Sequence, residues 1–239
     1  MVTGPFREGR RGRQEPDVPF VDREQAGREV GERLAGVPCR HPVVLALPRG
    51  GVPVGYQVAL AIGAPLDVIV VRKLGVPFQS ELAMGAIGED GVQVMDEAVV
   101  AAARVSPADI YAVEARERAE LVRRVRRYRS VCGRVPLAGR TAIVVDDGMA
   151  TGSTARAACL VARAHGASQV IMATPVASPQ AVAMLGQVAD HVVALEQPDP
   201  FFAVGRWYRH FGQVSDDDVL AVLASTGTRS HQGPSTTED

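Results

Sequence analysis

Short apolar segments alternate with amphipathic segments along most of this 239-residue chain. Five of the apolar segments have the length and composition of buried strands: Val43–Leu47, Leu66–Val71, Thr141–Val145, Val170–Thr174 and His191–Leu195. Helical patterns follow most of them, at Val52–Ile62, Thr154–His165 and Pro179–Val188, and Asp22 can cap a further helix that runs to about Ala35. Buried strands that alternate with helices predict an α/β fold in which a parallel five-stranded sheet is flanked by helices.

The stretch between the second and third predicted strands is too long for a simple crossover connection. Ala83–Met95 has the pattern of a hairpin that turns at Glu89-Asp90-Gly91. Ser106 and Pro107 then provide an N-cap and a first-turn proline, so we expect a helix from here to about Arg129. The region therefore carries a hairpin and a long helix in addition to the alternating pattern.

The two ends of the chain differ from its middle in composition. Residues 1–18 are rich in Arg, Gly and Pro, and residues 225–239 in Ser, Thr and Gly, so neither end has enough apolar side chains to build a core. We therefore expect a disordered basic N-terminal arm at 1–18, one domain at 19–224 and a disordered tail at 225–239.

The formal net charge is −1, and the three cysteines show neither pairing nor metal-ligand spacing, which favours a cytoplasmic protein with reduced thiols. No segment has the pattern of a signal peptide or the length of a membrane span.

Residues 143–155 carry the clearest chemical pattern of the chain. The apolar run that ends at Val145 is followed by two adjacent carboxylates, Asp146 and Asp147, then by a loop of small and hydroxyl-bearing residues, and then by a helical stretch. Loop amides and the positive end of a helix dipole suit a phosphate, whereas the acidic pair suits hydroxyl groups, a metal ion or a developing cation. A ligand that combines a phosphate with a polyol fits both halves, and a plain helix-capping turn is the alternative.

Other phosphate-binding and catalytic motifs fit these residues poorly. The chain has no Gly-Lys-Ser/Thr sequence of a P-loop, and Ser153 is not the centre of a Gly-x-Ser-x-Gly sequence. The acidic pair precedes the glycines, whereas the acid of a dinucleotide-binding fingerprint follows them by about twenty residues.

The 143–155 segment resembles the signature of the type I phosphoribosyltransferases, which bind 5-phosphoribosyl 1-diphosphate (PRPP), and residues 20–222 most resemble a bacterial group of this family. The resemblance implies that Asp146 and Asp147 hold the ribose hydroxyls and take part in magnesium binding indirectly, through PRPP and water. It implies that the residues after them bind the phosphate part of PRPP: Gly148, Met149, Ala150, Thr151, Gly152, Ser153 and Thr154.

A second candidate loop follows the first predicted strand. Leu47-Pro48-Arg49-Gly50-Gly51 combines two glycines, which let the backbone approach an anion, with an arginine that can bind phosphate oxygens through two donors. The resemblance assigns Arg49, Gly50 and Gly51 to the pyrophosphate leaving group, although the same sequence also suits an ordinary turn.

Lys73 is the only lysine of the chain and stands at the end of a predicted strand. Lysine is a compact charge that arginine does not replace at a tight site, and the family places a basic residue near this strand end. We therefore assign Lys73 to leaving-group stabilisation, with Arg72 as the second choice. A lysine that extends from a strand end to solvent is the alternative.

The acceptor-binding residues follow no clear pattern. The resemblance implies a mobile flap at about residues 75–130 and a small C-terminal hood that helps to build the acceptor pocket. Glu81, at the root of the flap, and Trp207 and Tyr208, in a cluster of aromatic residues, are the acceptor candidates. An exposed glutamate and a small satellite core are the alternatives. Hypoxanthine–guanine enzymes of the family have an acid at the position of Ala150, whereas adenine and orotate enzymes have alanine there, which disfavours a 6-oxopurine acceptor.

These patterns predict a PRPP-dependent phosphoribosyltransferase, a pentosyltransferase that moves the 5-phosphoribosyl group to a nitrogen or oxygen acceptor and releases pyrophosphate. The acceptor is a nucleobase or a small natural product, Mg²⁺ is the expected cofactor, and the family leads us to expect a homodimer in nucleotide metabolism. The alternative is a PRPP-sensing regulatory protein that binds nucleic acid. The arginine-rich helix at 114–129 is the one feature that favours it, and Glu–Arg pairs at i,i+4 spacing there favour an ordinary solvated helix.

Overall fold

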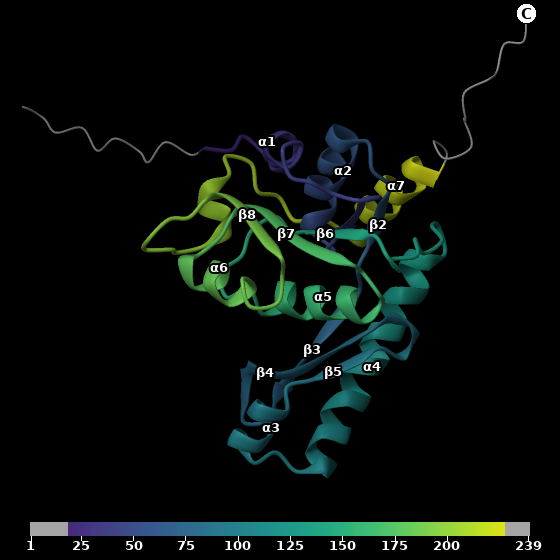
Figure 1. Cartoon of the computed structure of the whole chain (residues 1–239), viewed down its shortest axis with the longest axis vertical. Helices are drawn as coiled ribbons and strands as arrows, with labels where there is room; N and C mark the ends of the chain where they lie inside the picture. Colours follow the sequence, from purple (N-terminus) through teal and green to yellow (C-terminus); the bar gives the residue numbers. More distant parts are fainter. Residues whose placement is uncertain (1–18, 228–239) are drawn as a thin grey trace, which may run out of the picture.

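A five-stranded parallel sheet forms the centre of the computed structural model, which describes residues 19–227 (Figure 1). Its strands are β1 (Val43–Ala46), β2 (Leu66–Val68), β6 (Thr141–Val145), β7 (Gln169–Val176) and β8 (His191–Glu196). They lie in the order β2-β1-β6-β7-β8, and every neighbouring pair is parallel. All residues of β1 and β6 are buried, which is why these strands are almost entirely apolar in the sequence. The predicted α/β fold is confirmed.

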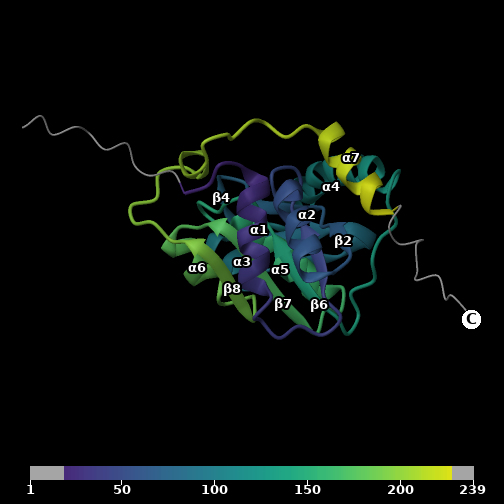
Figure 2. The same cartoon turned by 90° about the horizontal axis from the view of Figure 1, so that it is seen from above.

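Helices cover both faces of this sheet, as Figures 1 and 2 show. One face carries α1 (Arg23–Leu34), α2 (Gly51–Ile62) and α7 (Asp216–Gly227), and the other carries α5 (Ser153–Ala164) and α6 (Pro179–Leu185). The Asp22 side chain caps α1 by accepting a hydrogen bond from the Gln25 amide, as predicted. Among residues 19–227, no helix is both long and apolar enough to cross a membrane.

A smaller unit, residues 71–129, is inserted between β2 and β6. It contains the antiparallel strands β3 (Val71–Val76), β4 (Gln79–Gly88) and β5 (Gln93–Met95), the turn η1 (Glu89–Gly91), and the helices α3 (Glu97–Ala103) and α4 (Pro107–Arg129). The predicted hairpin turn and the helix capped by Ser106 are confirmed. The inserted unit lies below α5 in Figure 1 and includes most of the predicted flap, whose mobility stays a prediction.

The prediction of one strand over Leu66–Val71 is wrong. The chain leaves the main sheet after Val68 and begins β3 of the second sheet at Val71. Ile69 is buried in the core beside α5, and Val70 is buried in the core on the opposite side. The apolar pattern therefore continues through the break and gives no sign of it.

The sequence pattern also missed α3 and α7. Because α7 extends to Gly227, the tail predicted from residue 225 begins inside a helix. The predicted arm at 1–18 and the rest of the tail, 228–239, lie outside the described residues.

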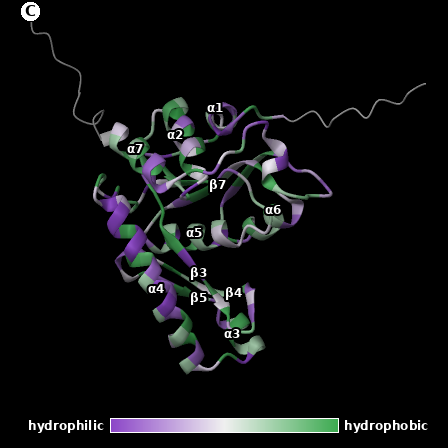
Figure 3. Ribbon diagram, turned by 180° about the vertical axis from the view of Figure 1, so that it is seen from behind, coloured by the Kyte–Doolittle hydropathy of each residue, from purple (hydrophilic) through white to green (hydrophobic). Residues whose placement is uncertain are grey.

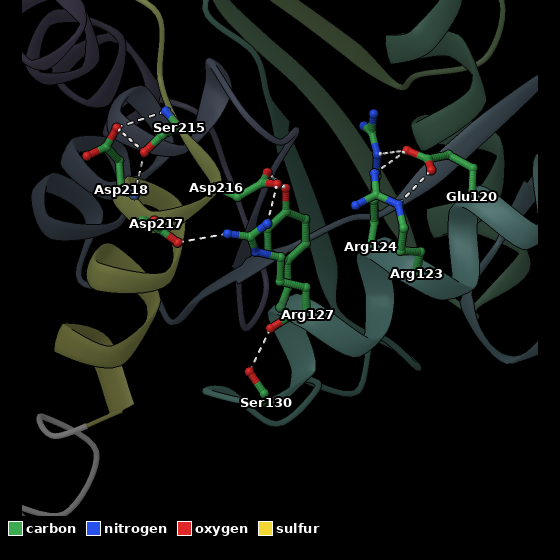
Figure 4. A network of polar contacts seen from close by, with 10 residues as sticks. Glu120, Arg123, Arg124, Arg127, Ser130, Ser215, Asp216, Asp217 and Asp218 are labelled. Atoms are coloured by element: carbon green, nitrogen blue, oxygen red, sulfur yellow. Dashed lines mark hydrogen bonds and ion pairs between the residues drawn. The ribbon is translucent and has the colours of Figure 1, made fainter.

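Most arginines of α4 are paired with acidic side chains. Glu120 accepts hydrogen bonds from Arg123 and Arg124, and Arg127 pairs with two aspartates at the start of α7 (Figure 4). The Tyr128 hydroxyl donates to one of these, Asp216, at 2.8 Å. Burial and this contact raise the pKa of Tyr128 to about 12. Figure 3 shows the hydrophilic residues of this helix in purple. The second half of α4 therefore attaches α7 to the inserted unit.

A buried ion cluster joins the inserted unit to the main sheet. Arg129, the last residue of α4, donates to Asp67 Oδ1 at 2.6 Å and to both carboxylate oxygens of Glu89 at 2.8 and 2.9 Å. The side chains of Asp67 and Glu89 are 2% and 8% exposed. We call Asp67, Glu89 and Arg129 the junction cluster. It connects β2, the turn η1 and the end of α4.

Candidate functional site

The two candidate loops lie side by side at the carboxyl edge of the main sheet. Strands β1 and β6 are parallel neighbours, and the Leu47 amide donates to the Val145 carbonyl at 2.8 Å. From β1 the sheet continues outward through β2, and from β6 it continues in the opposite direction through β7 and β8. Open α/β sheets bind ligands at such a switch point, in the crevice outside the strand ends.

Glycines let the two loops approach each other closely. A Cβ added to Gly50 would overlap the Asp147 carboxylate, and one added to Gly51 would lie 2.6 Å from the Val145 carbonyl oxygen. The backbone of the predicted pyrophosphate loop therefore contacts the predicted ribose-binding acids. The Pro48–Arg49 peptide bond in this loop is cis. The side chain of Arg49 is exposed and makes no ion pair with any residue in 19–227.

The two side chains of the acidic pair are partly buried and have different hydrogen-bond partners. The Asp147 amide donates to Asp146 Oδ1 at 2.9 Å, and Arg23 Nε donates to Asp147 Oδ2 at 2.7 Å. Burial, followed by the negative charge of Asp147, raises the pKa of Asp146 well above its usual range. Of the two adjacent carboxylates, only Asp147 thus forms an ion pair with a cation from residues 19–227.

The loop after the acidic pair is held in place by the end of β7. The Met149 amide donates to the Val176 carbonyl at 2.9 Å, and the Ser178 hydroxyl donates to the Ala150 carbonyl at 2.6 Å. The Met149 side chain is buried, so only its backbone is available to a ligand. Gly148 packs directly against Val204, where an added Cβ would overlap the valine side chain.

The same loop leads into the N-terminus of α5. Gly152 adopts a positive φ of 70° at the N-cap, which favours glycine. The hydroxyls of Thr151 and Ser153 lie 3.2 Å apart, and Thr151 and Thr154 are exposed. Backbone amides, hydroxyls and the positive end of the helix dipole converge here, an arrangement that suits a phosphate.

The other predicted cations come from the inserted unit. Arg72, Lys73 and Glu81 line a pocket of about 390 Å³ whose wall also includes Thr154 of the predicted phosphate loop, residues 150–154. Lys73 Nζ lies 3.4 Å from Glu81 Oε2, and the Glu81 side chain is 78% exposed. Arg72 is already bound to Glu117 of α4 at 2.6 Å. The structure therefore brings Lys73 and Glu81 toward the phosphate loop and leaves Arg72 less free to bind a ligand.

The two predicted acceptor aromatics occupy different surroundings. Trp207 is half-buried at the end of a short 3-10 helix (Val204–Trp207). Tyr208 is buried, with its ring 5.5 Å from Phe20 and 5.0 Å from Phe211 between ring centroids, and its hydroxyl donates to the Asp147 carbonyl at 2.5 Å. The ring of Tyr208 thus packs against protein, as in the satellite-core alternative, and its polar end contacts the backbone of the acidic pair.

Sequence patterns missed two residues that shape this site, Arg23 and Ser178. Ser178 is an ordinary helix cap by pattern, and nothing local reveals its second contact with Ala150. The position of Arg23 in the sequence could have indicated its role. It is the first residue of α1, where the helix dipole disfavours a cation. A basic residue in that position is better explained by an acidic partner elsewhere.

The acidic pair offers hard oxygen donors of the kind that Mg²⁺ prefers. Over the described part of the chain, no three His, Cys, Asp or Glu side chains gather into a metal site. The described residues thus contain no complete protein metal site, and the indirect role of the acidic pair in magnesium binding, through PRPP and water, stays a prediction.

Comparison with known proteins identifies the family. The phosphoribosyl transferase domain model matches residues 32–205, more than half of the chain, and the chain therefore belongs to this family. The type I phosphoribosyltransferase resemblance is confirmed.

Two curated Mycobacterium tuberculosis proteins, from strains CDC 1551 and H37Rv, bear the name "Putative phosphoribosyl transferase". Each is 55% identical to this chain over 204 residues, which cover 85% of this chain and 46% of the relative. The chain thus spans about half the length of these curated relatives. The crystal structure of TT1426 from Thermus thermophilus is similar as well, with a TM-score of 0.82 and 43% identity over 86% of this chain and 98% of that one.

Proposed function

We propose that this protein transfers the 5-phosphoribosyl group of PRPP to a nitrogen or oxygen acceptor and releases pyrophosphate. The observation that carries this proposal is the contact between the Gly50 backbone and the Asp147 carboxylate. It joins an arginine-bearing anion loop, an acidic pair and a phosphate-binding helix end at one switch point. PRPP has an anionic group, a pair of ribose hydroxyls and a second anionic group in the same order.

Each part of the site then has a role in displacing pyrophosphate from C1 of the ribose. Amides and hydroxyls of residues 150–154 bind the 5-phosphate, which positions C1 by binding energy remote from the reaction. Asp146 and Asp147 accept hydrogen bonds from the ribose hydroxyls and place negative charge beside a transition state with oxocarbenium character. Arg49 and Lys73 stabilise the charge that develops on the leaving pyrophosphate. Mg²⁺, when bound, neutralises charge on the diphosphate.

Glu81 and Trp207 are the residues that we propose for the acceptor site. Glu81 is exposed in the pocket that Thr154 also lines, and Trp207 is half-buried, so both are available to an acceptor. The ring of Tyr208 is enclosed, and we assign it a positioning role toward Asp147 instead. A nucleobase or a small natural product remains the proposed acceptor class, and action as a cytoplasmic homodimer in nucleotide metabolism belongs to the same proposal.

The paired arginines of α4 support an enzyme over a nucleic-acid-binding PRPP sensor. Arg123, Arg124 and Arg127 each bind an acidic side chain, so their charges are largely neutralised within the protein. A surface that binds nucleic acid needs basic residues that are free to contact phosphates.

The test is pyrophosphate release from PRPP and Mg²⁺ across a panel of nucleobases, small amines and aminocyclitols. We expect release that depends on one acceptor and is absent from an Asp146→Asn/Asp147→Asn double variant. Calorimetry with PRPP alone separates binding from turnover. PRPP binding without release for any acceptor would favour a sensor, and a wild-type protein that does not bind PRPP would contradict the proposal.

A further inference from the structure

Arg23 links the acidic pair to a segment far along the chain. Besides its contact with Asp147 Oδ2, it donates through Nη1 to the Gly212 carbonyl at 2.7 Å. Its guanidinium lies over the Phe211 ring, 3.9 Å from the centroid. The side chains of Arg23 and Asp147 are 11% and 14% exposed, so their attraction is screened less than that of a surface pair.

The segment that Arg23 contacts is also bound to the start of the domain. We call residues 207–212 the strap. The Phe20 amide donates to the Trp207 carbonyl at 3.2 Å, and the Arg209 amide donates to the Phe20 carbonyl at 2.8 Å. The strap therefore reaches Asp147 by two routes, through Arg23 to the carboxylate and through the Tyr208 hydroxyl to the backbone carbonyl.

We propose that Arg23 is a positioning residue of the PRPP site, which orients the Asp147 carboxylate for the ribose and couples ribose binding to the strap. This inference rests on the proposed function. Arg23 uses only Oδ2 of Asp147, and Oδ1 accepts no hydrogen bond from residues 19–227. Oδ1 is the oxygen left for a ribose hydroxyl, so Arg23 acts through Asp147 and does not occupy the ligand's place.

The shape of the side chain matters as much as its charge. Arg23 directs Nε to a carboxylate and Nη1 to a backbone carbonyl while its flat face lies on an aromatic ring. A lysine ammonium is a single point on a flexible stem and cannot make these three contacts together. Without a cation, the Asp147 carboxylate is repelled by Asp146 and loses its fixed orientation.

The experiment compares PRPP binding, in the presence of Mg²⁺, to the wild-type chain and to the variants Arg23→Gln and Arg23→Lys by calorimetry. Arg28→Gln is the matched control, because Arg28 is an exposed arginine of the same helix. We expect the Kd for PRPP to rise about tenfold or more in both Arg23 variants and to stay unchanged in the control. Urea unfolding of each variant reports whether the fold is intact.

A second readout follows the strap itself. Trp207 is the only tryptophan of the chain, so its fluorescence reports on this segment. We expect PRPP to change the emission of the wild-type and Arg28→Gln proteins, and to change it less in Arg23→Gln at saturating PRPP. Phe211→Leu removes the ring that lies under the guanidinium and beside Tyr208, and leaves the side chains of Arg23 and Asp147 unchanged. This variant should reduce the fluorescence response and change the Kd for PRPP less than the Arg23 variants do. It replaces the Arg23 variants as the test if they do not fold.

The outcomes separate the two proposals. An unchanged or lower Kd in Arg23→Gln, full function in Arg23→Lys, or a fluorescence response that no variant alters would overturn the role of Arg23 while PRPP binding by the wild type stands. A wild-type chain that does not bind PRPP would overturn the proposed function and this inference with it.

Discussion

Two groups of charged residues in this protein have the same composition and opposite arrangements. The junction cluster and the acidic pair each combine two carboxylates with one arginine. Arg129 binds both Asp67 and Glu89, whereas Arg23 binds Asp147 and leaves Asp146 without a side-chain cation. A buried cluster in which every charge is paired holds a fold together, and one with an unpaired carboxylate keeps an acceptor for a ligand.

The two groups of charges also differ in their effect on the free energy of unfolding. The raised pKa of Asp146 means that its carboxyl group binds a proton more tightly in the native state than in the unfolded chain. Ionised Asp146 therefore lowers stability, and this cost is complete once the pH is above the raised pKa. Asp146 therefore lowers the stability of the fold, whereas the carboxylates of the junction cluster are paired with Arg129 and avoid this cost.

The largest effect is expected from breaking the junction cluster. Arg129→Gln leaves Asp67 and Glu89 buried without a cation, so the free energy of unfolding should fall by about 3–5 kcal/mol, as measured by urea denaturation. Arg126→Gln is the control, since Arg126 is exposed on the same helix and pairs with no acid in the described part of the chain. A loss no greater than that of the control would show that the cluster does not stabilise the junction.

In the acidic pair we expect a smaller effect, in which a substitution lowers activity and does not lower stability. Asp146→Asn should lower kcat/KM for PRPP by roughly 10–100-fold, because a charged hydrogen-bond acceptor for the ribose is lost. The free energy of unfolding at neutral pH should stay unchanged or rise, because the variant removes a carboxylate whose ionisation is costly. Steady-state kinetics and urea denaturation measure the two effects. If the variant loses both activity and stability, Asp146 has a structural role instead.

The smallest effect concerns His165, which lines a narrow crevice beside the junction cluster. Burial and the positive charge of Arg134 lower the pKa of His165 to about 4. As the pH falls from 6.5 toward 4, the unfolded chain takes up a proton that the native state resists, so stability falls. His165→Gln should remove roughly 1 kcal/mol of this decline after solvent screening, measured by unfolding at about pH 7 and about pH 5. His210→Gln, at an exposed histidine, should leave the decline unchanged.

The sequence could predict what depends on neighbouring residues. The strands of the main sheet, the caps of α1 and α4 and the loops at residues 47–51 and 146–154 all follow from local pattern, and the strand order then places both loops together. The contact of Arg23 with Asp147 joins residues 124 positions apart, and no local pattern encodes it. The sequence left open whether Tyr208 contacts an acceptor or packs in a satellite core for the same reason, since its ring packs against Phe20 from the other end of the domain.

The inserted unit leaves the main sheet after Val68 and returns through Arg129, which donates to the Val68 carbonyl at 3.2 Å. The two ends of the inserted unit therefore lie close together, and β3 and β4 between them pack against α5. Residues 71–129 are joined to the core like a domain inserted in a loop. The insertion supplies Lys73 and Glu81 to one wall of the pocket, whereas the carboxyl edge of the main sheet supplies the acidic pair.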